Sequence, residues 1–448
     1  MKKWRCKICG YIHHGETPPD ICPVCDAGAE DFKELETFFI ETDRKKPESI
    51  IIIGNGAAGM EAARAIRENN QSVQITVFAK EHYPFYSRIH LSTFIGNEMS
   101  PDQIEIFPAS WYPENNIQVI TGTAVRNIQV RKKIIKTDKR KKYSFDKLII
   151  TTGAIPYLPP VNGLNKKGVF SLRNLDDALL IRDYAQSSNS AIVIGGGILG
   201  IESASSLNKR GLSVTVFEQQ DQLLPLQLDK SGAFFLQKVL EKRGIQFHLN
   251  SSVSAFTGRK KMEGVEAGGL DTIPADMALI SAGIVPDITL AREAGLTVNR
   301  GIVVNNRMET SHSDIYAAGD AAEFEGKLAG IWPAAVDQGL VAGLSALGLE
   351  TNYNGTTPLH ILKVSGIELT TIGKKYADKT DEHEMVITDS DQGTYVKLVH
   401  NRRILLGAIA LGVRGIGFRL EKTIKRQQPI DKILPELVRG NWEVLKIR

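Results

Sequence analysis

The sequence predicts an α/β protein in which two parallel-sheet domains of one type are preceded by a small cysteine-rich unit and followed by an α+β domain. Two apolar runs, residues 50–53 and 191–194, each end in a G-x-G-x-x-G segment that leads into a helical stretch and a second strand. All four cysteines lie within the first 25 positions. Residues 351–448 lack such glycine segments, and we expect strands at 394–399 and 404–410 before a helical tail.

The composition is that of a globular protein without a nucleic-acid or membrane role. Charged residues make up 24% and apolar residues 42% of the 448 residues, and the net charge is only +4. No apolar stretch reaches the roughly 18 residues that a membrane span needs, and the first residues lack the pattern of a signal peptide. We therefore expect a cytoplasmic protein, in which paired cysteines bind a metal instead of forming disulfides.

The cysteines form two pairs, Cys6-x-x-Cys9 and Cys22-Pro-x-Cys25, separated by twelve residues. Two such pairs can close one tetrahedral site of four thiolates, which suits zinc or iron. Residues 1–37 are too few to bury a sufficient core, so a metal must supply much of their folding free energy. The polar stretch that follows, residues 38–48, is predicted to be a linker.

The first glycine segment predicts a phosphate-binding turn between a strand and a helix. The first glycine of the motif permits the tight turn, the second lets the backbone approach a pyrophosphate, and the third lets the helix pack on the strand. The helix N-terminus then presents N–H groups to the anion. The residues concerned are Gly54, Gly56, Ala57, Ala58 and Gly59. The next strand is followed by Ala79 instead of a carboxylate, so Glu81 is either a ribose ligand or an exposed loop carboxylate.

The second glycine segment predicts the same kind of turn. Its residues are Gly195, Gly197, Ile198, Leu199 and Gly200. The following strand ends at Glu218, where a carboxylate can bond both hydroxyls of a ribose and would repel a 2′-phosphate. This favours NADH over NADPH, and the alternative is a solvated surface glutamate. Two such units indicate two Rossmann-like dinucleotide-binding domains.

These units and several further segments resemble the two-dinucleotide flavoprotein family of pyridine nucleotide-dependent oxidoreductases, which includes NADH:rubredoxin oxidoreductases. The segments are 84–91, 151–154, 281–286, 315–320 and 331–335. The resemblance implies FAD at the first unit and NADH at the second. Besides Glu81, the residues that it implies for FAD are Arg88, Thr152, Gly153, Gly319, Asp320 and Trp332, and those for NADH are Glu202 and Gly283.

The same resemblance suggests how the chain divides into domains. The FAD-binding domain would comprise residues 49–160 and 284–350, the NADH-binding domain 161–283, and a C-terminal interface domain 351–448. Residues 1–37 resemble the short rubredoxin domain of rubrerythrins, on Trp4, Gly10, Tyr11, the two cysteine pairs and Phe32. This implies one iron ion bound by Cys6, Cys9, Cys22 and Cys25. A zinc knuckle with the same ligands is the alternative.

The position of the cysteines also bears on the reaction. No cysteine follows Cys25, so a disulfide or peroxidase mechanism based on a thiol beside the flavin is excluded. We predict an FAD-dependent NADH:rubredoxin oxidoreductase with its rubredoxin fused at the N-terminus, which passes electrons from NADH through FAD and iron to an external acceptor. Glu202 is a candidate for positioning the nicotinamide, and the alternative is a buried carboxylate at a helix start.

Two other functions stay open. One is a flavin NADH oxidase that reduces oxygen directly, and the other is a flavoprotein whose four-cysteine unit is a zinc-bound interaction module. The resemblance implies acceptor proteins such as rubrerythrin or a flavodiiron protein, and a C-terminal domain that can form a homodimer. Residues 1–37 carry a net charge of −2 and the remainder +6, so weak electrostatic attraction between them is expected.

Overall fold

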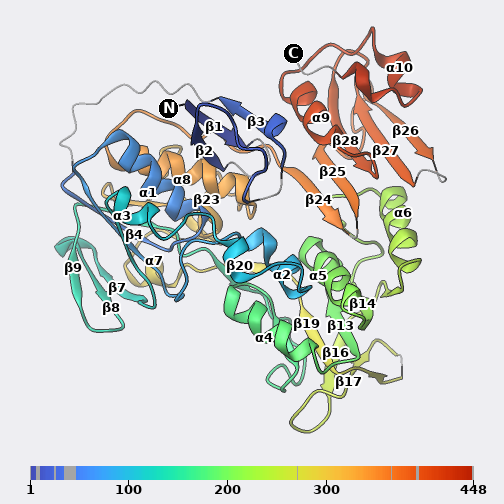
Figure 1. Cartoon of the computed structure of the whole chain (residues 1–448), viewed down its shortest axis with the longest axis horizontal. Coiled ribbons are helices and arrows are strands. Elements are labelled where there is room, and N and C mark those ends of the chain that lie inside the picture. Colours follow the sequence, from blue (N-terminus) through green and yellow to red (C-terminus); the bar gives the residue numbers. More distant parts are fainter. Residues whose placement is uncertain are drawn as a thin grey trace. The chain divides into compact units, whose positions relative to one another are not determined.

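The computed structural model describes residues 2–6, 11–24, 27–34, 47–269, 271–364, 366–389 and 393–445. They form two compact units, and Figure 1 labels many of their elements. Unit 1 holds the described residues of Met1–Ile89, Pro101–Ile155 and Ile284–Thr356, and unit 2 those of His90–Ser100, Pro156–Gly283 and Thr357–Arg448. None of the helices in the described ranges combines the length and apolarity that crossing a membrane demands.

The core of unit 1 is a five-stranded parallel sheet in the order β22-β10-β4-β5-β6. Its strands are β4 (Ser49–Ile53), β5 (Gln74–Phe78), β6 (Ile117–Ile120), β10 (Lys147–Ile150) and β22 (Ile315–Ala317). Parallel strands are covered on both faces and are therefore apolar throughout, as the four buried isoleucines of β4 illustrate. Helix α1 (Ala57–Asn69) joins β4 to β5, which confirms the predicted β-α-β order.

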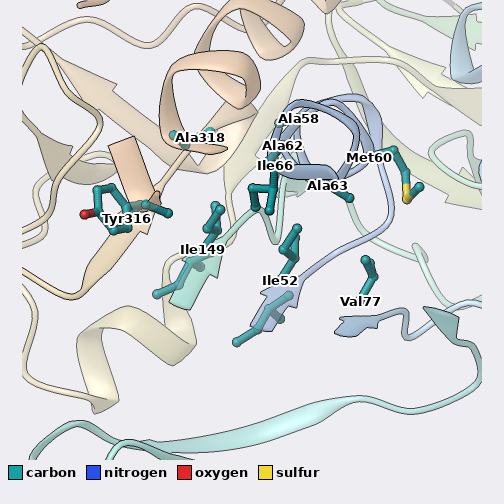
Figure 2. Close-up of a cluster of buried hydrophobic side chains, with 14 of the residues drawn as sticks. Ile52, Ala58, Met60, Ala62, Ala63, Ile66, Val77, Ile149, Tyr316 and Ala318 are labelled. Atoms are coloured by element: carbon teal, nitrogen blue, oxygen red, sulfur yellow. The ribbon is translucent and has the colours of Figure 1, made fainter. Parts of the chain in front are cut away.

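Helix α1 packs closely on helix α8 (Trp332–Ala346) because both helices carry small residues where they meet. A Cβ atom at Gly339 would lie 2.3 Å from the carbonyl oxygen of Ala58, and one at Gly343 would lie 2.7 Å from that of Ala62. Figure 2 shows Ala58 and Ala62 among the apolar side chains between α1 and the sheet, which include Ile52, Val77 and Ile149. The crossing therefore joins the start of α1 firmly to α8.

Unit 2 repeats the architecture with a second parallel sheet in the order β12-β19-β13-β14-β15. Its strands are β12 (Val169–Ser171), β13 (Ser190–Ile194), β14 (Ser213–Phe217), β15 (Ile245–His248) and β19 (Met277–Ile280). Helix α5 (Ile198–Lys209) joins β13 to β14, as the sequence predicts. The other helices of this part are α2 (Leu91–Ile95), α4 (Leu175–Ala185) and α6 (Lys230–Glu241). Two Rossmann-like sheets are thus confirmed.

The C-terminal part of unit 2 is a five-stranded antiparallel sheet in the order β24-β25-β28-β27-β26. Its elements are β24 (Leu359–Val364), β25 (Ile367–Gly373), β26 (His383–Asp389), β27 (Thr394–His400), β28 (Leu405–Leu411), α9 (Ile416–Lys425) and α10 (Leu434–Val438). The two predicted strands and the helical tail are confirmed, and three further strands complete the sheet. Asp229, which caps α6, accepts hydrogen bonds from Tyr395 and Lys397 of β27 at 2.8 and 3.1 Å.

The smaller sheets include the N-terminal one, in the order β2-β1-β3, built from β1 (Lys2–Cys6), β2 (Ile12–Gly15) and β3 (Phe32–Glu34). The alternating stretch at 123–146 forms the expected antiparallel meander of β7 (Val125–Gln129), β8 (Ile134–Thr137) and β9 (Lys142–Ser144). The remaining elements are α3 (Trp111–Glu114), β11 (Ala154–Pro156), β16 (Val253–Thr257), β17 (Gly264–Ala267), β18 (Ile273–Pro274), β20 (Ile284–Pro286), α7 (Thr289–Glu293), β21 (Ile302–Val304) and β23 (Ala322–Phe324).

Candidate functional site

The turn between β4 and α1 has the shape that a bound pyrophosphate requires. Gly54 has a φ angle of +114°, and a Cβ atom there would lie 2.1 Å from the carbonyl oxygen of Thr151. A Cβ atom at Gly59 would lie 2.0 Å from the carbonyl oxygen of Gly54. At Gly56, by contrast, no atom lies within 4 Å of the added Cβ, so this glycine faces open space at the helix N-terminus. The turn therefore fits a phosphate group that approaches Gly56 and the first N–H groups of α1.

The other residues expected at FAD follow strands of the same sheet. Thr152 and Gly153 come after β10, and Gly319 and Asp320 after β22. The Thr152 hydroxyl donates to the Asp287 carbonyl oxygen at 2.6 Å. A Cβ atom at Gly319 would approach the Cβ of Ala58 to 3.0 Å, so the last signature touches the first turn. Ligands of open parallel sheets bind at the carboxyl ends of the strands, and these residues lie there together.

Glu81 follows β5 and is paired with cations and donors of its own loop. It forms an ion pair with Arg88, and the Tyr86 hydroxyl donates to it at 2.5 Å. Burial works against the charge of Arg88, but Tyr86, Glu81 and Asp320 together raise its pKa above the usual value. Glu81, Arg88 and Asp320 thus share one electrostatic environment, and the Glu81 side chain is only 18% exposed. Its role as a ribose ligand stays a prediction.

Trp332 begins α8 and lies flat against the ring of Phe85, with ring centroids 5.9 Å apart and an interplanar angle of 13°. Both rings line one pocket, to which Ala57 of the first turn also contributes. Val24 and Tyr11 of the cysteine-rich unit line the same pocket. The expected flavin-side tryptophan therefore lies next to the start of α1 and next to the N-terminal unit.

The turn between β13 and α5 repeats the first turn almost atom for atom. Gly195 has a φ angle of +114°, and a Cβ there would lie 2.2 Å from the carbonyl oxygen of Ser281. A Cβ at Gly200 would lie 2.0 Å from the carbonyl oxygen of Gly195, whereas Gly197 and Gly283 face open space. Ile198 and Leu199 form the first turn of α5 behind Gly197. This turn fits a second pyrophosphate.

Glu218 lies at the end of β14, directly beside this second turn. Its carboxylate accepts hydrogen bonds from the backbone N–H of Gly196 at 2.6 Å and of Gln220 at 2.8 Å. These bonds hold the carboxylate next to the turn, where a ribose attached to the phosphate would lie. Glu218 is therefore oriented by the backbone and is not a free surface side chain.

Glu202 lies on α5, two residues after the third glycine of the turn. The Ser92 hydroxyl of α2 donates to its carboxylate at 3.0 Å. Burial raises the pKa of Glu202 to about 7, although the bond from Ser92 acts in the opposite direction. Such a carboxylate changes its protonation state near neutral pH, which suits a group that meets a reacting ring.

Two of the four expected metal ligands are described, and both are deeply buried. Cys6 and Cys22 have no exposed surface. The backbone N–H of Cys6 donates to the Tyr11 carbonyl oxygen at 2.6 Å and that of Cys22 to the Ala27 carbonyl oxygen at 2.7 Å, so each cysteine is bonded to the residue five positions further on. Cys9 and Cys25 lie outside the described residues, and the residues that are described hold no group of three or more His, Cys, Asp or Glu in metal-binding arrangement.

The small aromatic core expected around a four-thiolate ion is present. The Trp4 indole donates to the Gly15 carbonyl oxygen at 3.1 Å, and the rings of Tyr11 and Phe32 meet edge to face. Two buried cysteines in equivalent backbone bonds fit a tetrahedral iron or zinc ion, since both metals take thiolate ligands in this geometry.

Family models match three parts of the chain. Residues 48–339 match the model described as pyridine nucleotide-disulphide oxidoreductase, residues 4–33 the rubredoxin-like domain of rubrerythrin, and residues 358–428 the C-terminal domain of rubredoxin NAD+ reductase. The first match covers more than half of the chain. The chain belongs to the pyridine nucleotide-disulphide oxidoreductase family.

Individual relatives agree with this assignment. The chain is 34% identical over 388 residues to the NADH-rubredoxin oxidoreductase of Clostridium acetobutylicum, which covers 87% of this chain and 97% of the relative. The crystal structure of NADH:rubredoxin oxidoreductase from Clostridium acetobutylicum is similar with a TM-score of 0.71 and 31% identity, over 88% of this chain and 100% of that one.

A third relative is longer than the chain. The assimilatory nitrate reductase electron transfer subunit of Bacillus subtilis (strain 168) is 33% identical over 387 residues, or 86% of this chain. The chain spans only about half the length of that relative, 50%.

The structure adds residues to this oxidoreductase family site that sequence reasoning did not find. Ser92 meets Glu202 from a helix 110 positions away, and Tyr86 and Asp287 hold Glu81 and Thr152. No local pattern signals Ser92 or Asp287, because these two contacts join residues more than 100 positions apart, whereas Tyr86 lies only five positions after Glu81. The glycine turns, in contrast, carry their own signal, since their function depends on backbone geometry alone.

Proposed function

We propose that the chain is an FAD-dependent NADH:rubredoxin oxidoreductase that carries its own rubredoxin-type iron module and delivers electrons to an external acceptor protein. The overall reaction oxidises one NADH to NAD+, releases one proton and reduces two one-electron acceptors. The name and the match in length of the Clostridium acetobutylicum relative support the first part of the proposal. The rubredoxin-like match at residues 4–33 supports the second.

The proposed sites divide between the two units. In unit 1 the turn at Gly54–Gly59, with Glu81, Arg88, Thr152, Gly153, Gly319, Asp320 and Trp332, would hold FAD. In unit 2 the turn at Gly195–Gly200, with Glu202, Glu218 and Gly283, would hold NADH. Cys6, Cys9, Cys22 and Cys25 would hold one iron ion. When bound, FAD supplies a group that accepts two electrons as hydride and can release them singly, and the iron accepts and releases one electron at a time.

The side chains of the protein would bind and orient these groups and would not react covalently. The two helix N-termini would bind the pyrophosphates, and Glu218 would accept hydrogen bonds from the ribose hydroxyls of NADH. Asp320 and Arg88 would position the ribityl chain of FAD. Trp332 and Phe85 would exclude water from one side of the flavin ring. Glu202, with its pKa of about 7, would orient the nicotinamide ring.

The observation that carries the proposal is the position of the cysteines in the sequence. All four cysteines lie in the N-terminal module, and none lies at Ser87 or anywhere beyond Cys25. The flavoprotein part therefore lacks the thiols through which disulfide reductases pass electrons on. The module supplies the thiolates instead, and it packs against the proposed FAD domain inside unit 1.

The external acceptor is proposed by resemblance alone. Rubrerythrins and flavodiiron proteins use rubredoxin-type donors, so a protein of this kind is the acceptor that we propose, and the C-terminal domain is proposed to support a homodimer. Direct reduction of oxygen by the flavin is the competing activity. A zinc-filled module would leave that activity as the main one.

Anaerobic stopped-flow mixing of the full-length protein with NADH tests the proposal. We expect about one iron and one FAD per chain, loss of the flavin absorption first, and then loss of the ferric-thiolate absorption. Cys9→Ser should keep the first phase and lose electron delivery to an added acceptor. An as-isolated protein with zinc in place of iron, or a ferric band that NADH leaves unchanged, would refute the proposal.

A further inference from the structure

The cysteine-rich module, defined as the described residues of 2–34, lies on a particular face of unit 1. The Ser87 hydroxyl donates to the backbone carbonyl oxygen of Val24 at 3.0 Å. Val24 stands between Cys22 and Cys25, so the second cysteine turn itself makes this contact. Ser87 and Val24 are 0% and 1% exposed, which shows that the contact is closed to solvent.

A second contact ties strand β1 of the module to helix α8. Arg5 of β1 forms an ion pair with Asp337, five residues after Trp332. Asp337 is held in place from the other side by the Thr356 hydroxyl, which donates to it at 2.7 Å. Both charged side chains keep about a quarter of their surface exposed, so salt can still weaken the pair.

Between these two contacts the module covers the start of α1 and α8. Tyr11 and Val24 line the same pocket as Ala57, Phe85 and Trp332. The buried ion pair of Glu61 and Arg64 on α1 also borders this pocket. The positive charge of Arg5 acts on Glu61 and partly offsets the rise in its pKa that burial causes. The module and the helix starts are therefore electrostatically coupled.

We infer that this face of unit 1 is the docking surface from which the module receives electrons, with the second cysteine turn held on Ser87 and the first strand held on Asp337. The inference rests on the proposed function, and it adds the orientation of the module and the residues that set it. Ser87, Arg5 and Asp337 are positioning residues, because they form the contacts between the module and the rest of unit 1 and do not themselves react.

The contacts explain why one orientation is preferred. A hydrogen bond to a backbone carbonyl fixes the position of the turn without requiring a particular side chain at residue 24. The ion pair joins a different part of the module to a different element of unit 1, so the two contacts together restrict rotation of the module about either one. Because the module is part of the same chain, its local concentration is high, and weak contacts are enough to keep it docked.

A cross-linking experiment tests the orientation directly in the full-length holoprotein. Arg5→Lys places a primary amine beside Asp337, and a water-soluble carbodiimide then joins the two through an amide bond. We expect mass spectrometry to find the peptide that links positions 5 and 337 within one chain at low protein concentration. Arg5→Lys combined with Asp337→Asn is the matched control and should not give this peptide.

A charge-reversal series tests the consequence for electron transfer. In anaerobic stopped-flow, Asp337→Arg should slow the loss of the ferric band about fivefold at low salt, since a partly exposed ion pair changes an equilibrium by about that factor. Arg5→Asp together with Asp337→Arg should restore most of the rate. Asp378→Arg, an equally large charge change on the exposed surface of unit 2, is the control and should leave the rate unchanged.

The outcomes separate this inference from the proposed function. If NADH bleaches the ferric band equally fast in the parent and in Asp337→Arg, and no link between positions 5 and 337 forms, the docking surface is wrong while the function stands. If NADH never bleaches the ferric band of the parent, the function fails. A cross-link together with a rate that the double reversal restores would support both.

Discussion

The two glycine turns carry a glutamate at the same place, and its surroundings differ. Glu61 follows Gly59 by two residues in α1, and Glu202 follows Gly200 by two residues in α5. Glu61 is bonded by the guanidinium of Arg64, with one N–H donating at 2.9 Å. Glu202 accepts from the Ser92 hydroxyl and has no ion-pair partner among the described residues.

The difference teaches that equal spacing in a motif does not mean an equal role. Burial raises the pKa of both glutamates, but at Glu61 the adjacent Arg64 opposes this rise. At Glu202 only a neutral hydroxyl opposes it, and the pKa reaches about 7. We interpret Glu61 as part of a buried structural ion pair and Glu202 as a group that can gain or lose a proton in the working range of an enzyme.

The largest expected effect comes from filling either turn. Gly59→Val should yield a protein without FAD, because its Cβ would overlap the carbonyl oxygen of Gly54. Gly200→Val should keep FAD and raise the KM for NADH by about 100-fold, since overpacking of this kind costs up to about 3 kcal/mol. Flavin absorbance of the purified variants and steady-state kinetics give both results. If Gly200→Val lost FAD and Gly59→Val kept it, the two assignments would have to be exchanged.

Alanine at the open glycines sharpens the same comparison. No protein atom lies within 4 Å of a Cβ at Gly56 or at Gly197. Thermal unfolding of the cofactor-free protein should therefore not change in Gly56→Ala or Gly197→Ala. FAD retention should fall in the first variant and NADH affinity in the second, because a ligand phosphate would meet the new methyl group. Normal affinity in both variants would show that no phosphate approaches there.

The largest expected loss of folding stability should come from the ion pair of Glu61 and Arg64 in α1. Arg64→Met leaves the buried Glu61 without its partner, which is expected to lower the free energy of unfolding by about 3–5 kcal/mol. The combination of Glu61→Gln with Arg64→Met should recover most of that loss. Denaturant unfolding of the three variants measures it. Equal stability of Arg64→Met and the parent would contradict the structural role.

The counterpart in the second turn should give a pH-dependent effect. The pKa of Glu202 is higher in the folded protein than in the unfolded chain. The free energy of unfolding therefore falls as pH rises from about 4.5 to about 7, and does not fall further at higher pH. Glu202→Gln should remove this pH dependence, whose total size is on the order of 2–3 kcal/mol of unfolding free energy. Denaturant unfolding at pH 5 and pH 8 measures the difference. Ser92→Ala should shift the slope to higher pH, because its hydroxyl stabilises the charged carboxylate.

The smallest expected effect concerns the choice of nicotinamide cofactor. Glu218→Gln should weaken NADH binding about tenfold, since hydrogen bonds to a charged group contribute about 1.5–3 kcal/mol. The ratio of kcat/KM for NADPH and NADH should rise in this variant. Glu81→Gln is the matched change in the first turn and should leave this ratio alone while weakening FAD retention. An unchanged cofactor ratio in Glu218→Gln would place the ribose elsewhere.

The sequence was sufficient for the parts of the molecule that depend on local backbone geometry. The two turns, their strands and helices, and the meander at 123–146 follow from glycine positions and alternation over short stretches. The C-terminal sheet was only partly predicted, because the sequence analysis expected two of its five strands. The division into domains and the roles of the individual site residues remain proposals.

What sequence could not provide are contacts across long separations. Arg5 and Asp337 are 332 positions apart, and Ser87 meets Val24 across 63 positions. Arg5, Asp337 and Ser87 are common polar residue types, and Val24 takes part through its backbone, so no composition or period marks these contacts. The same is true of the difference between Glu61 and Glu202, which is decided by Arg64 in one case and by a serine from another helix in the other.

The close crossing of α1 and α8 also limits how this chain can evolve. Gly339 and Gly343 touch the backbone of Ala58 and Ala62, so any larger side chain there would push the two helices apart. Each helix is preceded by a loop that begins at the end of a strand. A displacement of the helices would therefore move both loops. Substitution of these interior glycines is therefore expected to disturb the proposed ligand site, although the glycines themselves contact only protein.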